Sequence, residues 1–271
     1  MRKKSIRISG ILLIAFTFPA VGWVSSKKSD LSFSNKAHKT KETPVNKSSS
    51  NTELFDQHIH SVYEQANLAK AGLDQSIFKK ALIGYYNLKK TQLLSAQKSV
   101  LTIIDFSKKS SEKRLWIIDL ESSKLLFNTL VAHGRGSGMD MATSFSNQPN
   151  SHQSSLGFYV TSDTYIGKHG LSMRLDGLDK GFNSNAKERA VVIHGADYVS
   201  QSFVNQTGRL GRSHGCPALP VELTKTIINA IKGQTVLFIS GPSVQYKSEF
   251  LNQNMAVANF ISSANPVQAS I

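Results

Sequence analysis

Three short apolar segments decide the fold of this 271-residue chain: VLTIIDF at Val100–Phe106, RLWIIDL at Arg114–Leu120 and LLFNTLV at Leu125–Val131. Each is rich in isoleucine, leucine and aromatic residues, which favour β-strands, and each has the length of an ordinary strand. The polar stretches between them, 107–113 and 121–124, are short. Three strands with such short connections predict an antiparallel meander.

Further strands are predicted downstream of the meander. They lie at Gly157–Thr161, Leu171–Leu175, Ala190–Ile193 and Thr235–Ile239. A helix is predicted at Val221–Ile231, where Leu223, Ile227 and Ile231 share one face, and Gly233 is placed to end it. Many strands with one late helix predict a mostly β domain with added helices, an α+β fold built as a β-sandwich or partial barrel.

Two helical patterns precede the first strand. Apolar residues recur at helical spacing at Phe55, Ile59, Val62, Tyr63 and Ala66, and again at Phe78, Ala81, Leu82 and Tyr85. We expect residues 54–98 to form two N-terminal helices that pack on the outside of a domain spanning residues 99–240. Residues 241–271 are then a C-terminal extension.

The N-terminus has the layout of a secretory signal. Four basic residues within the first seven positions precede a 14-residue apolar run, Ile11–Val24. Because a membrane-spanning helix needs roughly 20 apolar residues, residues 1–26 are predicted to be a signal peptide, with an N-terminal membrane anchor as the alternative. Residues 27–53 are predicted to be a flexible basic linker that could lie on anionic lipid. In either case we expect export to the periplasm or cell envelope.

The chain is strongly basic, with 32 Lys and Arg residues against 18 Asp and Glu. Half of the net charge of +14 lies in residues 1–53, which contain ten basic and three acidic residues. A basic chain suits nucleic acid, an anionic membrane surface or a carboxylate-rich polymer. The sequence has no basic patch with interleaved aromatic residues, so we expect no nucleic-acid partner.

The residues that can carry chemistry lie in two segments, Val191–Gly195 and Gly211–Pro220. The first ends a predicted strand with His194, and the second holds Cys216, the one cysteine of the chain, within GRSHGCPALP. One cysteine excludes an internal disulfide and a zinc site of two thiolates. Its loop of glycine, proline, serine, arginine and histidine has no apolar periodicity, unlike the surroundings of a core cysteine. A Cys–His pair of this kind predicts nucleophilic acyl transfer through a thiolate.

In these segments the chain resembles the L,D-transpeptidase catalytic domain, also called the YkuD-type domain. The resemblance is carried by the strand IHGA, by GRLGRSHGCPALP and by the upstream segments GRGSG and SSLG. It extends over roughly residues 99–240, with the two N-terminal helices expected to belong to it as well, and implies a YkuD-like fold. Many members of the family carry Arg or Asn two positions after the cysteine, where this chain has Ala218 after Pro217.

The resemblance implies a role for several residues of the two segments. Cys216 is the nucleophile, His194 is its base, and the backbone carbonyl of Gly195 orients the imidazole. Backbone N–H groups of the loop that contains His214 and Gly215 form the oxyanion hole, which stabilises the charge of the tetrahedral intermediate. The side chain of His214 has a supporting role.

The resemblance also implies the substrate. The family cleaves a peptidoglycan tetrapeptide stem after the diamino acid at position three, releases the terminal D-alanine, and transfers the thioester-bound stem to an amine or to water. Arginine is suited to holding the carboxylates of such stems. The candidates to bind the stem are Arg212 and Ser213 in the cysteine loop and Arg174. We expect Arg135 and Arg209 to be ordinary surface residues.

Three alternatives stay open from the sequence. The first is an L,D-carboxypeptidase, with water as the acceptor, and the second is a non-catalytic cell-wall-binding module. The third is a zinc peptidase, but the histidines lack the H-E-x-x-H spacing, so we expect no metal and no cofactor. The glycine-rich segment His133–Gly138 lacks the spacing of a phosphate loop and is expected to be a mobile loop beside the cleft. We expect a monomer.

Overall fold

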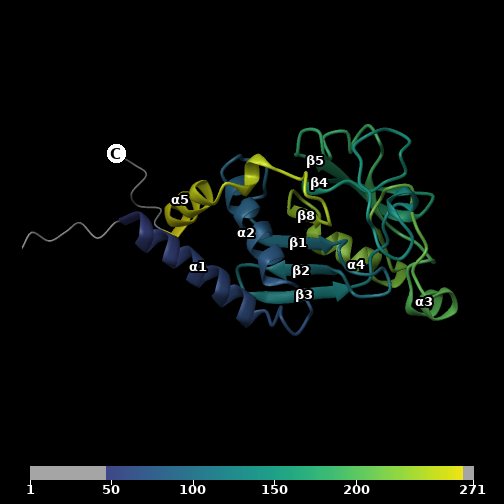
Figure 1. Ribbon diagram of the computed structural model, residues 1–271, viewed down its shortest axis with the longest axis horizontal. Coiled ribbons are helices and arrows are strands. Elements are labelled where there is room, and N and C mark those ends of the chain that lie inside the picture. The colour runs from purple at the N-terminus through teal and green to yellow at the C-terminus, as the bar shows by residue number, and fades with distance from the viewer. Residues whose placement is uncertain (1–46, 265–271) are drawn as a thin grey trace, which may run out of the picture. The chain divides into compact units, whose positions relative to one another are not determined.

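The computed structural model describes residues 47–264, which Figure 1 follows from one end to the other. The predicted signal peptide and residues 27–46 of the predicted linker lie outside the described residues. Helix α1 begins at Lys47, so the last residues of the predicted linker are helical, because a helix with a buried face extends past that face at low cost. No helix within residues 47–264 is long and apolar enough to cross a membrane.

Eight strands within the described residues form one curled sheet. They are β1 (Val100–Asp105), β2 (Leu115–Asp119), β3 (Lys124–Thr129), β4 (Gly157–Gly167), β5 (Gly170–Gly177), β6 (Val192–Gly195), β7 (Ala218–Leu219) and β8 (Val236–Ser240). Their order across the sheet is β3-β2-β1-β8-β4-β5-β6-β7. The first three strands are the predicted antiparallel meander, whereas β1 pairs with β8, and β6 with β7, in parallel. This sheet with its added helices confirms the predicted α+β fold.

The centre of the sheet, strands β1, β2 and β8, is buried on both faces, which explains the almost continuous apolar runs of these strands. In β2, Trp116 and Ile118 belong to one hydrophobic core, and Leu115 and Ile117 belong to another. Because successive residues of a strand point to opposite faces, a helical layer must cover each side.

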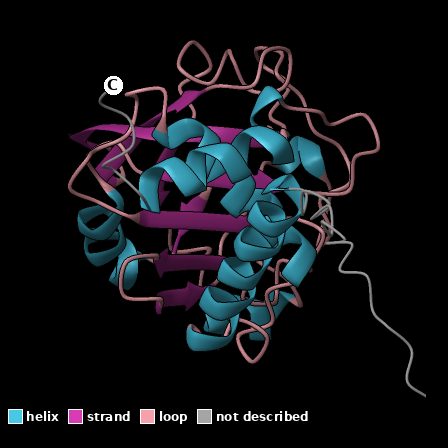
Figure 2. Cartoon of the chain, turned by 90° about the vertical axis from the view of Figure 1, so that its left-hand side faces the viewer, coloured by secondary structure: helices cyan, strands magenta, loops and turns pink. Residues whose placement is uncertain are grey.

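Helices supply both layers. On one face pack α1 (Lys47–Gln65), α2 (Gln75–Lys89) and α5 (Gln253–Ala264), which Figure 2 shows lying over the strands. The other face is covered by α4 (Val221–Ile231), whose Ile227, Ile228 and Ile231 are buried there. A short helix, α3 (Gln201–Thr207), and two 3-10 turns, η1 (Arg135–Ser137) and η2 (Glu249–Leu251), lie in loops. The two predicted N-terminal helices and the predicted late helix are confirmed.

Helix α5 was not predicted from the sequence because long-range contacts hold it. The Asn87 side chain of α2 donates hydrogen bonds to the backbone carbonyls of Phe250 (2.8 Å) and Asn252 (2.9 Å), just before α5. Its amide oxygen in turn accepts a bond from Asn259 within α5 (3.0 Å). A polar residue buried in α2 therefore fixes the position of the C-terminal helix.

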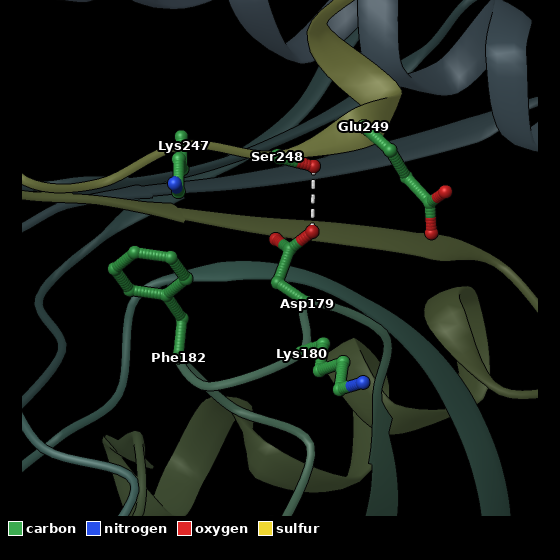
Figure 3. Close-up of a pocket in the computed structure, with 6 residues that line it drawn as sticks. All are labelled: Asp179, Lys180, Phe182, Lys247, Ser248 and Glu249. Carbon is green, nitrogen blue, oxygen red and sulfur yellow. Dashed lines mark hydrogen bonds between the residues drawn. The ribbon is translucent and has the colours of Figure 1, made fainter.

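A buried carboxylate fastens the chain that leads to α5. Asp179 accepts hydrogen bonds from the Phe158 backbone N–H (2.7 Å) and from the hydroxyls of Tyr246 (2.8 Å) and Ser248 (2.5 Å); Figure 3 shows the last of these. Burial raises the pKa of Asp179 above its ordinary value. The three donors satisfy a carboxylate that would otherwise be costly to bury.

Helix α2 approaches the sheet closely at a glycine. A Cβ atom at Gly84 would overlap two carbons of the Phe158 ring, closer than atoms can pack. The ring stacks in turn on Phe238 of β8, with centroids 4.4 Å apart. Gly84 therefore sets the distance between the helical layer and the sheet.

Replacing Gly84 with alanine tests whether close packing against Phe158 outweighs the higher helix propensity of alanine. In a solvated helix, glycine to alanine stabilises by about 1 kcal/mol. For Gly84→Ala we expect the opposite sign, a loss of about 1–3 kcal/mol, because the methyl group overpacks against Phe158. Urea unfolding of Gly84→Ala, Phe158→Leu and the double variant measures the coupling. A stabilised Gly84→Ala, or one whose penalty is unchanged beside Phe158→Leu, would contradict the packing argument.

Candidate active site

The parallel pairing of β6 with β7 brings the two predicted segments together. His194 of β6 lies opposite Ala218 of β7, and Gly195 lies opposite Leu219. Cys216 precedes β7 by two residues, and its sulfur accepts a hydrogen bond from the Val192 backbone N–H at 3.5 Å. Adjacent strands thus hold the predicted base and the predicted nucleophile.

A cavity of about 650 Å³ opens at this point. Its lining includes Cys216, His194, His214, Arg212 and Ser213 from the two predicted segments. The rest of its wall comes from the β4–β5 hairpin, from the chain around Arg189 and from Tyr198 after β6. The predicted residues other than Arg174 therefore lie at, or directly behind, one hollow of the surface.

Cys216 is a half-buried thiol with two backbone neighbours. Besides the Val192 N–H, its Sγ lies 3.6 Å from the carbonyl oxygen of Ala190. Burial raises the pKa of the thiol, and the Val192 N–H, the charge of Arg189 and the N–H of Cys216 itself act to lower it. Since burial is the largest of these influences, the thiol needs a base to ionise it for reaction.

His194 has the surroundings of a neutral imidazole. Its Nδ1 lies 2.9 Å from the backbone carbonyl oxygen of Gly195, and the side chain is buried. A carbonyl can only accept, so Nδ1 carries the proton and Nε2 keeps its lone pair. Burial lowers the pKa of His194, and the charges of His169 and Lys168 lower it further. The ring of His169 stacks on that of His194, with centroids 4.6 Å apart.

The turn before the cysteine is held by Ser213 and shaped by Gly215. The Ser213 hydroxyl donates to the Cys216 carbonyl oxygen at 2.6 Å and accepts from the Gly215 N–H at 3.0 Å. Gly215 has φ +126°, and a Cβ there would lie 2.9 Å from the carbonyl oxygen of Gln153. Both contacts of the Ser213 hydroxyl lie inside the loop, and the Gly215 N–H is engaged by it. Of the loop amides, the N–H of Cys216 is the one that acts on the sulfur.

The remaining predicted residues lie on the rim. His214 is exposed, with its ring 4.6 Å from that of His152. Arg212 donates to the carbonyl oxygen of Gly138 at 2.9 Å. The Arg174 guanidinium lies 4.5 Å from the centre of the Tyr165 ring. Arg174 lines a neighbouring cavity of about 220 Å³, which shares the Tyr165 wall with the first.

Sequence reasoning missed four residues of the site. Lys168 and His169 at the hairpin tip, Tyr198 after β6, and Arg189 before it all line the cavity. No spacing rule distinguishes a surface Lys-His pair or an Arg five positions before a histidine. The segment ERAVVIHG places Glu188 beside Arg189, so its charge pattern gave no signal for Arg189 either.

A buried arginine and a buried histidine lie next to the cysteine loop and help to hold it in place. Arg114 is fully buried, and its guanidinium lies 2.7 Å from Nδ1 of His133 while donating to the carbonyl oxygen of Val131. The His133 carbonyl accepts from the Ser213 N–H at 3.0 Å, and the Arg135 N–H donates to the Ser213 carbonyl at 2.8 Å. The glycine-rich segment is thus tied to the cysteine loop by backbone hydrogen bonds on both sides of Ser213.

The comparisons with known proteins give a family and a set of folds. The model of the L,D-transpeptidase catalytic domain matches residues 69–240. The comparison with curated proteins gives no match. Among solved structures, an L,D-transpeptidase from Mycobacterium smegmatis is 12% identical, with a TM-score of 0.34, over 53% of this chain and 59% of that chain.

Two further solved structures are similar to the same degree. A variant of the helical cell shape determining protein Pgp2 from Campylobacter jejuni is 12% identical, with a TM-score of 0.40, over 66% of this chain and 63% of that chain. L,D-transpeptidase 3 from Mycobacterium tuberculosis is 12% identical, with a TM-score of 0.33, over 53% of this chain and 61% of that chain. This chain spans less than two thirds of the length of each.

The Arg114–His133 contact predicts how stability depends on pH. Burial, with the charge of Arg114, lowers the pKa of His133 to about 4, so the unfolded chain binds this proton more readily, with an ordinary pKa near 6.5. The contribution of His133 to the free energy of unfolding is therefore fully present above pH 6.5. It falls by about 3 kcal/mol as the pH is lowered to 4.

The measurement is urea unfolding between pH 7.5 and pH 4 for the wild type and for His133→Gln. The variant should lose most of this pH-dependent part. His60→Gln, which removes an exposed histidine of α1, should keep the wild-type slope. Equal slopes for the wild type and His133→Gln would contradict the role given to the buried pair.

Proposed function

Because the chain belongs to the L,D-transpeptidase catalytic domain family, we propose that it is an exported cysteine acyltransferase that acts on peptidoglycan tetrapeptide stems. The observation that carries the proposal is the pairing of β6 with β7, which puts Cys216 and His194 at one cavity. In this proposal Cys216 is the nucleophile, His194 its base, and the Gly195 carbonyl the group that orients the base.

The first half-reaction forms a thioester. Nε2 of His194 takes the thiol proton, and the sulfur of Cys216 attacks the carbonyl carbon of the diamino acid at position three. The Cys216 N–H stabilises the oxyanion. When the tetrahedral intermediate collapses, the C–N bond breaks and His194 returns the proton to the amine of the departing D-alanine.

The second half-reaction regenerates the enzyme with a free Cys216 thiol. A side-chain amine of another stem attacks the thioester carbonyl, gives up a proton to His194, and displaces the sulfur as a thiol. The result is a new amide between the two stems. If water attacks instead, the product is a shortened stem with a free carboxylate, and the enzyme is an L,D-carboxypeptidase.

The charge of the cavity supports an anionic substrate. Among the described residues that line it, Lys168, Arg189 and Arg212 are basic and none is acidic. Stem peptides carry free carboxylates, which such a wall attracts. Arg212 on the rim, and Arg174 in the neighbouring cavity, are the proposed contacts for them. Ser213 serves the substrate indirectly in this scheme, by holding the loop.

The domain organisation completes the proposal. Residues 1–26 direct export to the periplasm or cell envelope as a signal peptide or membrane anchor, and residues 27–46 are a basic tether. The catalytic domain spans residues 99–240, with residues 47–98 and the described part of the C-terminal extension, residues 241–264, packed on it. The protein acts as a monomer.

Substitution of the catalytic pair tests the mechanism. Cys216→Ala should abolish release of D-alanine from a tetrapeptide-stem muropeptide, because the chain has no other thiol to replace it. His194→Asn should lower the rate by roughly 10²–10⁴, the usual contribution of a positioned acid–base group. Mass spectrometry of the products measures both and separates the cross-linked dimer of transpeptidation from the shortened stem of hydrolysis. Near wild-type turnover by Cys216→Ala would exclude the thiol mechanism.

A carbapenem tests the covalent intermediate, since carbapenems acylate the cysteine of this family. We expect the intact mass to rise by one inhibitor, with the adduct mapped to a peptide that contains Cys216. His194→Asn should slow this acylation, because the base no longer activates the sulfur, and EDTA should leave it unchanged. An adduct on a serine, or loss of acylation in EDTA, would contradict the assignment.

A further inference from the structure

Arg189 lies in the wall of the catalytic cavity beside the loop that carries Cys216. A Cβ atom on Gly215, the residue before the cysteine, would lie 3.4 Å from Nη2 of Arg189. The guanidinium is thus packed against the turn itself, while Arg212 and His214 occupy the rim. Arg189 precedes β6, so the strand that presents His194 also fixes this arginine.

Neutral groups hold the guanidinium. Its Nη1 donates to the Ser146 carbonyl (2.7 Å) and to the Ser155 hydroxyl, and its Nη2 donates to the Gln153 carbonyl (2.6 Å) and the Ser151 hydroxyl (3.2 Å). Within residues 47–264, Arg189 has no salt bridge to a carboxylate. Carbonyls and hydroxyls orient a guanidinium without neutralising it. Its four N–H bonds also leave it poorly placed to grip a substrate carboxylate in bidentate fashion.

The uncompensated charge acts on the thiol. Burial raises the pKa of Cys216, and the charge of Arg189 opposes that shift. Burial lowers the pKa of Arg189 itself, and the charges of Tyr159 and Cys216 oppose that shift. Burial, with a smaller contribution from the charge of Cys216, raises the pKa of Tyr198 to about 12. The other titratable or charged groups that face the cavity are Tyr165, Lys168, His169, His194, Arg212 and His214.

We propose that Arg189 is a positioning residue of the catalytic site whose fixed positive charge favours the thiolate form of Cys216. The proposal rests on the proposed function in that it takes Cys216 as the nucleophile. His194 removes the proton, and Arg189 stabilises the anion that remains, both before attack and when the thioester is broken. The same bonds orient the Ser146–Ser155 loop, whose Ser154 hydroxyl donates to the Gly215 carbonyl at 3.2 Å.

The choice of variants separates the effect of the Arg189 charge from the effect of its hydrogen bonds to the Ser146–Ser155 loop. Arg189→Met removes both the positive charge and the hydrogen bonds to the loop. Arg189→Gln removes the charge but keeps an amide that can donate hydrogen bonds. Arg189→Lys keeps the charge but cannot make the four hydrogen bonds of the guanidinium. Lys187→Met, a matched control, removes one exposed positive charge two residues away. Thermal unfolding verifies that each variant is folded.

The experiment is alkylation of the full chain by iodoacetamide from pH 6 to pH 10, followed by intact mass. Because Cys216 is the one sulfhydryl of the chain, the rate reports its thiolate fraction. We expect the midpoint of the pH profile to rise by about one unit in Arg189→Met and Arg189→Gln, a roughly tenfold slower reaction below the midpoint. The midpoint should stay near that of the wild type in Arg189→Lys and Lys187→Met.

Two outcomes would overturn the proposal. If the neutral variants keep the wild-type midpoint, the charge does not act on the thiol. If Arg189→Lys shifts as far as Arg189→Gln, the residue acts through the loop. Iodoacetamide requires no peptidoglycan, so a shifted midpoint in a chain that does not turn over muropeptides would refute the proposed substrate and leave the role of Arg189 standing.

Discussion

The site depends on the parallel pairing of two very short strands. Strand β7 has two residues, yet it sets Ala218 opposite His194 and thereby carries Cys216 to Val192. So short a ladder contributes few hydrogen bonds of its own, and a second backbone contact reinforces it, because the Ala132 N–H donates to the Ala218 carbonyl at 2.9 Å. The distance between base and nucleophile is therefore a property of three chain segments, and no single loop determines it.

The cations around the site are held by neutral acceptors. Arg114 below the cysteine loop and Arg189 beside it donate to carbonyls, hydroxyls and an imidazole nitrogen. The two ion pairs recorded for residues 47–264, Lys79–Asp56 and Lys108–Glu112, involve no residue of the cavity wall. A site whose positive charges are oriented but not neutralised keeps a field that acts on a thiolate and on anionic ligands.

The elements that were predicted from the sequence are those that a local residue pattern determines. The meander, the α4 helix and the Cys–His segments each have a periodicity or motif within about a dozen residues, and the structure contains these elements. Helix α5 and Arg189 could not be predicted because their positions depend on partners remote in sequence: Asn87 is over 160 residues from the carbonyls that it holds. The sequence also could not predict that the Ser213 hydroxyl forms hydrogen bonds within its own turn. A serine near a nucleophile can equally well contact the substrate.

The helical layer joins the two ends of the described chain. The Phe260 ring of α5 lies 5.3 Å from that of Phe55 in α1 and stacks at 4.8 Å on His58. During synthesis, α1 emerges first and must wait for the whole β-domain before its partner exists. Such late closure delays folding and leaves an apolar face uncovered until the end. The face of α1 that contacts α5 therefore stays uncovered until the last helix of the described chain has been made.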